Sequence, residues 1–183
     1  MLCAGALGAA TLAGCASTVQ DQPIPHNILE SVISAPFPVY WLGGKFDGLQ
    51  VSEVAHDPAG AYTLQYGDCM QAGQGTCVPP LRIVTSPDNS FLPGDGTPRR
   101  TTRIRGVRAV IAQQDKTILI PTGNVVIDIF AANPRTAAAA ARIAVPINQI
   151  AAPEAPLPAA LPNTGFGERA MRSQEPPPLR PIG

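Results

Sequence analysis

Residues 103–146 read RIRGVRAVIAQQDKTILIPTGNVVIDIFAANPRTAAAAARIAVP, and this stretch decides the fold class. It opens with three apolar, β-branched runs separated by short turns, as in antiparallel hairpins. They cover residues 103–113, 117–122 and 125–130. An Ala-rich run follows, with Asn133 placed to cap a helix and Pro134 at the first helical position, where its missing N–H costs nothing. We therefore predict three strands and one helix that packs on them and ends at Pro146.

The preceding part of the chain shows the same alternation. Runs rich in β-branched and aromatic residues predict four further strands, over 38–42, 49–56, 61–66 and 81–86. Apolar side chains recur at helical spacing in residues 27–33, which predicts a short helix docked on the domain or lying on a membrane. The fold class that follows is α+β. It is mainly an antiparallel sheet of about seven strands in two halves, with one Ala-rich C-terminal helix packed on it.

Composition limits the chain to one ordinary domain and excludes one class of partner. The 183 residues include thirteen acidic and thirteen basic side chains, so the net charge is zero. A protein that binds nucleic acid needs an excess of cations to displace the counterions of the phosphates. No nucleic acid partner is therefore expected.

The first fourteen residues, MLCAGALGAATLAG, carry no charged side chain and run directly into Cys15. Such a short apolar segment is typical of a secretory signal. Its end, LAGC (Leu12–Cys15), resembles the lipobox of bacterial lipoproteins. The resemblance implies that Cys15 is lipidated and becomes the first mature residue, anchoring the protein to the extracytoplasmic face of the cell membrane. In the alternative, this is an ordinary secretory signal and Cys15 is incidental.

Two cysteines, Cys69 and Cys77, remain beyond the leader, with glycines between them that let the chain double back. In an oxidising envelope this pair predicts a disulfide. Zinc is an alternative that would need His26 and His56, but the spacing is wide for a metal knuckle, so no metal is expected. A catalytic cysteine lacks a recognisable partner histidine.

The chain ends in a Pro-rich segment, residues 151–183, which predicts a disordered tail. It contains LPNTG at 161–165, the motif of proteins that sortase attaches to the cell wall. The hydrophobic stretch and basic end that a sortase substrate needs are missing after it, so the match is ascribed to chance. The predicted organisation is signal 1–14, tether 15–35, domain 36–150 and tail 151–183.

Charge is unevenly distributed along the chain. Between Asp21 and Asp95 the chain has eight acidic and two basic residues, and between Arg99 and Arg142 it has eight basic and two acidic residues. The two groups either pair across the domain or leave a basic patch for anionic lipid headgroups or a wall polymer. The candidate patch comprises Arg99, Arg100, Arg103, Arg105 and Arg108. Within it, Arg103 and Arg105 are predicted to share one face of a strand.

The sequence carries none of the common catalytic or phosphate-binding motifs, and no cofactor is expected. Asp47, Asp57 and Asp68 are isolated carboxylates. FPVYWLGGKFDGL, followed by YGDC and PPL, resembles a group of short secreted or lipid-anchored proteins of high-GC Gram-positive bacteria over residues 36–148, which implies no activity.

Three functions remain open. The first is a non-enzymatic envelope lipoprotein that binds or scaffolds an unknown protein or envelope polymer. The second is a lipid or glycolipid carrier with an apolar pocket between sheet and helix. The third is a secreted hydrolase that uses a pair of carboxylates.

Overall fold

The computed structural model describes residues 24–68, 70–71, 77–87 and 99–161. It confirms the α+β fold class. The elements, in chain order, are α1 (His26–Ile33), β1 (Tyr40–Trp41), β2 (Lys45–Phe46), β3 (Leu49–His56), β4 (Tyr62–Tyr66), β5 (Met70–Gln71), β6 (Cys77–Val78), β7 (Leu81–Ser86), β8 (Arg99–Ile104), β9 (Val107–Ala112), β10 (Thr117–Thr122), β11 (Val125–Ala131), α2 (Pro134–Ile143) and β12 (Val145–Pro146).

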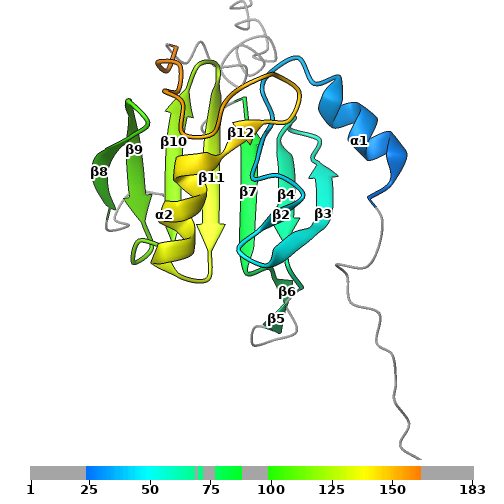
Figure 1. The fold of residues 1–183 in the computed structure, drawn as a ribbon, viewed down its shortest axis with the longest axis horizontal. Helices are drawn as coiled ribbons and strands as arrows, with labels where there is room; N and C mark the ends of the chain where they lie inside the picture. The colour runs from blue at the N-terminus through cyan, green and yellow to red at the C-terminus, as the bar shows by residue number, and fades with distance from the viewer. Residues whose placement is uncertain (1–23, 69, 72–76, 88–98, 162–183) are drawn as a thin grey trace, which may run out of the picture.

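One antiparallel sheet of eight strands dominates the molecule, in the order β2-β3-β4-β7-β11-β10-β9-β8 (Figure 1). The two halves of the chain meet where β7 pairs with β11, from Leu81 opposite Ala131 to Ser86 opposite Val126. The predicted strand over 38–42 is only the two-residue β1, which pairs with β12 outside the main sheet. Both sequence halves therefore form one continuous sheet.

The predicted strand over 103–113 is wrong, because the chain turns back inside it. Arg105 and Gly106 have φ angles of 51° and 88°, and Ile104 pairs with Val107 on either side of them. Two residues with positive φ are typical of the tight turn that suits the twist of a hairpin. The region therefore forms the hairpin β8–β9, and Arg105 lies in its turn and not on a strand face beside Arg103.

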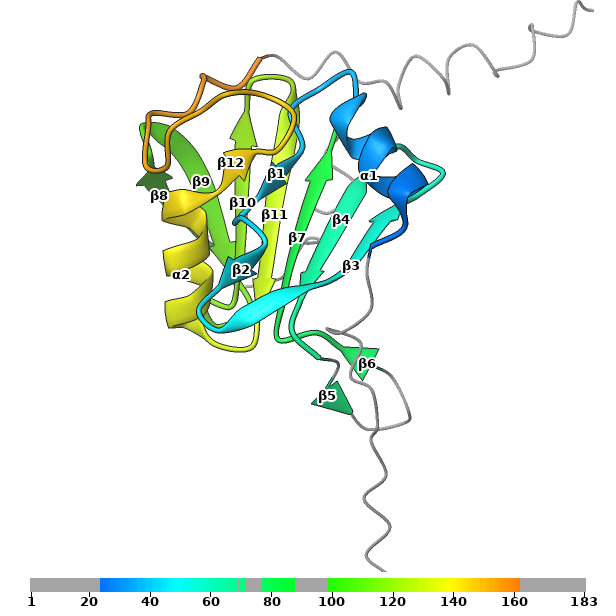
Figure 2. The same ribbon diagram turned by 45° about the vertical axis from the view of Figure 1, so that its right-hand side comes forward.

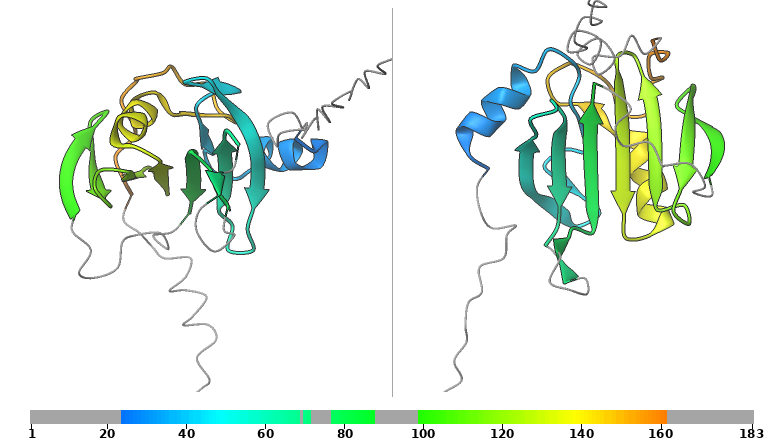
Figure 3. Two further views of the ribbon diagram at one scale, coloured as in Figure 1. Left: turned by 90° about the horizontal axis from the view of Figure 1, so that it is seen from below. Right: turned by 180° about the vertical axis from the view of Figure 1, so that it is seen from behind.

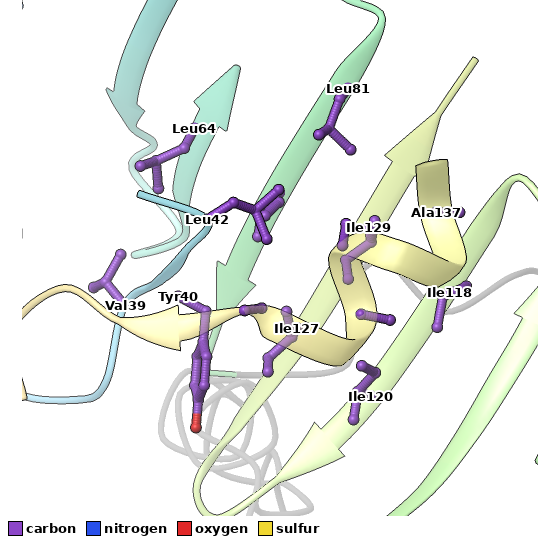
Figure 4. Packing of buried hydrophobic residues seen from close by; sticks show 14 of the residues in the cluster. Val39, Tyr40, Leu42, Leu64, Leu81, Ile118, Ile120, Ile127, Ile129 and Ala137 are labelled. Carbon is purple, nitrogen blue, oxygen red and sulfur yellow. The ribbon is translucent and has the colours of Figure 1, made fainter. Parts of the chain in front are cut away.

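Helix α2 covers one face of the sheet, which curves around it (Figure 3). We call this the helix face and the opposite one the outer face. The side chains between α2 and the strands are buried, as Figure 4 shows for the four isoleucines of β10 and β11. The buried side chains between α2 and the strands are those of Ile118, Ile120, Ile127, Ile129, Ala137, Ala140 and Ala141. The short alanine side chains let the helix axis lie close to the sheet, as the sequence predicts.

The start of α2 is as expected from the sequence, but its end is not. The Asn133 side chain accepts a hydrogen bond of 2.9 Å from the Thr136 N–H, which caps the helix. The helix ends at Ile143, before Pro146, because Val145 and Pro146 pair with β1. Asn148 then accepts from the Val39 N–H at 3.0 Å, which fixes the two chain segments side by side.

Helix α1 packs at the β3 edge of the sheet (Figure 2). Val32 is fully buried, and the Tyr62 hydroxyl donates to the Ser31 carbonyl at 3.0 Å. Ile24 and Ile28 also contact the core. The predicted helix is thus present and docked on the domain. The predicted tether is too long, since its residues from 24 onward belong to the packed domain.

Residues 147–161, here called the strap, pack across one end of the sheet, so the first part of the predicted disordered tail is ordered. Leu157 is buried, and its N–H donates to the Arg105 carbonyl at 2.9 Å. The Gly123 N–H donates to the Pro158 carbonyl at 3.2 Å, and the Leu161 N–H donates to the Gly123 carbonyl at 2.6 Å. Main-chain hydrogen bonds and one leucine anchor order this Pro-rich segment. Residues 162–183 lie outside the described residues.

Candidate functional site: the arginines of the edge hairpin

The cysteines of the predicted lipidation and disulfide lie largely outside the residues that the structure describes. The lipobox, including Cys15, and the side chains of Cys69 and Cys77 are not among the described residues. The backbone of β5 and β6 does form a hairpin, in which Gln71 pairs with Cys77. The disulfide and the lipidation both stay predictions.

The hairpin β8–β9 forms one end of the main sheet and carries all five arginines of the predicted patch. Strand geometry divides them, because successive side chains point to opposite faces. The outer-face side chains are Arg99, Arg103 and Arg108, here called the outer arginines. Arg100 points to the helix face, and Arg105 lies in the turn. The patch therefore has three members and not five.

The outer arginines are exposed and closely spaced. Arg103 lies directly opposite Arg108 in the register of the hairpin, where side chains are about 5 Å apart at Cβ. Arg99 precedes Arg103 by four residues and lies on the same face, about 13 Å away along the strand. One guanidinium nitrogen of Arg103 donates to the Gly106 carbonyl at 3.2 Å, which orients it. Two like charges placed opposite each other destabilise a sheet, so the arrangement gains from an external anion.

The fourth arginine is neutralised locally. Arg100 donates to both carboxylate oxygens of Asp115, at 3.2 and 3.0 Å. This bidentate pair raises the pKa of Arg100 and lowers the pKa of Asp115. The carboxylate in the β9–β10 turn is thereby engaged on the helix-face side. It does not offset the outer arginines through an ion pair.

The fifth arginine has a structural role that sequence reasoning missed. The guanidinium of Arg105 donates to the Ala155 carbonyl at 2.6 Å and also to the Ala144 carbonyl, so it ties the strap to the end of α2. Burial lowers the pKa of Arg105, and the nearby Tyr40 and Glu154 oppose this shift. An Arg-Gly pair between apolar runs is the only signal in the sequence, and it marks the turn without indicating the partners.

In the part of the chain that the structure describes, the outer arginines take no part in the paired layers that one interpretation expects. Two ion pairs, His26–Glu30 and Arg100–Asp115, are both 3.0 Å long, and each lies within its own half of the chain. Asp128, on the outer face two strands from β9, is completely buried. The outer arginines therefore remain a surface of positive charge within the described parts of the chain.

Of the isolated carboxylates, Asp57 lies apart from Asp47. Asp47 and Asp57 lie beyond opposite ends of the eight-residue strand β3, and Asp57 accepts from the Ala61 N–H at 2.9 Å as part of a turn. A shallow depression of about 330 Å³ is lined by Phe46, Asp47, Arg135, Thr136 and Ala139. It offers one carboxylate, whereas hydrolysis by carboxylates uses two. This geometry counts against the hydrolase.

The carrier hypothesis needs an apolar space between sheet and helix, and side chains fill that region. Tyr40, Leu42, Leu64 and Leu81 join the isoleucines and alanines of β10, β11 and α2 in one buried cluster (Figure 4). Close packing of this kind leaves little room for an acyl chain. The observation counts against a ligand held beneath α2.

In the ranges that the structure describes, no three His, Cys, Asp or Glu side chains gather as metal ligands. Neither of the two described helices has the length and apolarity that crossing a bilayer requires. No protein-family model, curated protein or solved structure matches this chain.

Proposed function

We propose that this chain is a lipid-anchored protein of the cell envelope, held outside the membrane through Cys15, and that its domain is a non-enzymatic binding or scaffolding module. One observation carries the proposal: an uncharged apolar leader ends in LAGC at Leu12–Cys15. Acyl chains on a single residue give stable anchoring, because each buried methylene contributes about 0.8 kcal/mol.

The character of the domain supports a binding role. Asp47 and Asp57 do not converge, and the space beneath α2 is filled. Its distinctive surface is the outer arginine cluster. Arginine side chains present several donors in a fixed plane, which suits phosphate and carboxylate groups. The domain is thus suited to contact an anionic partner.

The anchor is tested by the intact mass of the protein isolated from membranes. The expected mass is that of a chain beginning at Cys15 and carrying acyl chains. The Cys15→Ala variant should keep its leader and lose the acyl mass. Cys3→Ala is the matched control, because Cys3 lies inside the leader and should leave with it. A wild-type mass equal to the unmodified polypeptide, with unchanged fractionation of Cys15→Ala, would overturn the proposal.

A further inference from the structure

We infer that the outer arginines Arg99, Arg103 and Arg108 dock the edge hairpin β8–β9 on an anionic lipid bilayer. The inference rests on the proposed function, because it names the partner of the domain's charged surface. It adds a second attachment point to the predicted anchor at Cys15.

The arrangement of the hairpin favours an extended anionic surface over a single small ion. Arg103 and Arg108 lie opposite each other, and Arg99 lies about 13 Å further along the same face. Such a row reaches several headgroups at once. It offers no enclosed pocket, since all three side chains are exposed. The opposed like charges also gain when phosphate oxygens come between them.

A carboxylate at the other end of the outer face indicates which part touches the membrane. Glu53 is exposed on the outer face of β3, where its carboxylate accepts from the Gln65 side chain at 2.6 Å. An anionic surface repels this carboxylate. The end of the sheet formed by β8 and β9 therefore approaches the headgroups, and the β3 end stays further away.

Chain length permits this tilted orientation together with the lipid anchor. From β3 to β8 the sheet has six strand spacings, or about 29 Å. Helix α1 packs at the β3 end. The eleven residue steps from Cys15 to His26 can span at most about 36–40 Å. An anchored Cys15 can therefore reach the bilayer while α1 stands above it.

The test measures sedimentation with vesicles, using the full chain with Cys15→Ser in every sample so that acylation plays no part. Neutral phosphatidylcholine vesicles are compared with vesicles that contain phosphatidylglycerol. The expected result is stronger binding to the anionic vesicles, weakening as NaCl is raised. Each arginine near such a surface is worth about a fivefold change in partition, the equivalent of ~1 kcal/mol. Arg103→Gln with Arg108→Gln should therefore reduce binding to anionic vesicles roughly thirtyfold.

The matched control is Arg100→Gln, which removes the same charge from the same strand but from the helix face. It should reduce vesicle binding far less than a single outer substitution. Thermal melting checks that the double variant stays folded, and its melting temperature should equal or exceed that of the parent because an opposed like-charge pair is relieved.

Three results would overturn the inference. The first is equal binding to neutral and anionic vesicles. The second is an effect of Arg100→Gln equal to that of Arg103→Gln, which would show dependence on net charge alone. The third is binding to a soluble polymer such as polyphosphate without binding to vesicles, which would identify a wall polymer as the partner. The samples carry no acyl chain, so failure here leaves the mass test of Cys15 unaffected.

Discussion

The link between Arg105 and the strap gives a quantitative prediction. Arg105→Asn removes the guanidinium that donates to the Ala155 and Ala144 carbonyls, while it leaves the hairpin turn intact. Asparagine tolerates the positive φ of 51° at this position, so the β8–β9 register should not change. The substitution thereby separates the contribution of the side chain from that of the turn.

The expected cost follows from the two lost hydrogen bonds. Bonds from a charged donor contribute about 1.5–3 kcal/mol each, and the lower figure applies because this side chain is only partly buried. Two bonds then amount to about 3 kcal/mol. Asparagine is less strained than arginine in this left-handed conformation, which offsets up to about 1 kcal/mol of the loss. The net loss is about 2 kcal/mol, which corresponds to a fall in melting temperature of about 6–8 °C for a domain of this size.

Thermal melting measures the total, and hydrogen exchange locates it. The N–H groups of Leu157 and Gly123 bond across the strap, so they should exchange faster in the variant than in the wild type. Arg108→Asn is the control, because its side chain is exposed and should change stability by less than about 0.5 kcal/mol. Unchanged melting together with unchanged exchange at Leu157 would refute the argument that Arg105 holds the strap.

Three further predictions concern the core, the alkaline range and the cysteines. Leu157→Ala should destabilise the domain by about 2–5 kcal/mol in denaturant unfolding, and a loss below 1 kcal/mol would mean that the strap is not part of the core. Burial raises the pKa of Tyr66 to about 12 from its ordinary 10.0, so the folded state holds this proton more tightly. The resulting stability is fully present below pH 10 and is lost as the pH rises toward 12. Tyr66→Phe should flatten this alkaline loss in a series of thermal melts at increasing pH. The variant should also lose about 1–3 kcal/mol of stability at neutral pH, because the buried Leu42 N–H loses its acceptor. A Cys69–Cys77 bond closing a loop of about nine residues should contribute roughly 2.6 kcal/mol, so reduction should lower the melting temperature; two reactive thiols titrated in the native protein would exclude the bond.

Much of the fold follows from local patterns in the sequence. Alternating apolar residues and turn signals place β3, β4, β7, β10 and β11 within about a residue of their observed bounds. Asn133 and Pro134 mark the start of α2 correctly. These features depend on neighbours in the chain, so a single sequence is enough to predict them.

The errors arise where distant residues decide the structure. The strap is held by the buried Leu157 and by the hydrogen bond from Arg105 to the Ala155 carbonyl. This bond joins residues 50 positions apart in the chain. Proline content alone predicts disorder there. The patch of five arginines divides because alternation along β8 separates Arg100 from Arg99 and Arg103, while the turn at Arg105 and Gly106 places Arg108 opposite Arg103. Lateral pairing, unlike periodicity, leaves no local trace.

The pairing of β1 with β12 has a consequence for when the chain can complete its structure during synthesis. Asn148 and Val39 are 109 positions apart, yet their hydrogen bond lies beside this pairing. Contacts of such separation form late, since the intervening chain must first be delivered. A partly synthesised polypeptide thus lacks the segment that pairs with its own beginning. The domain can therefore close only after nearly all of its residues have been made.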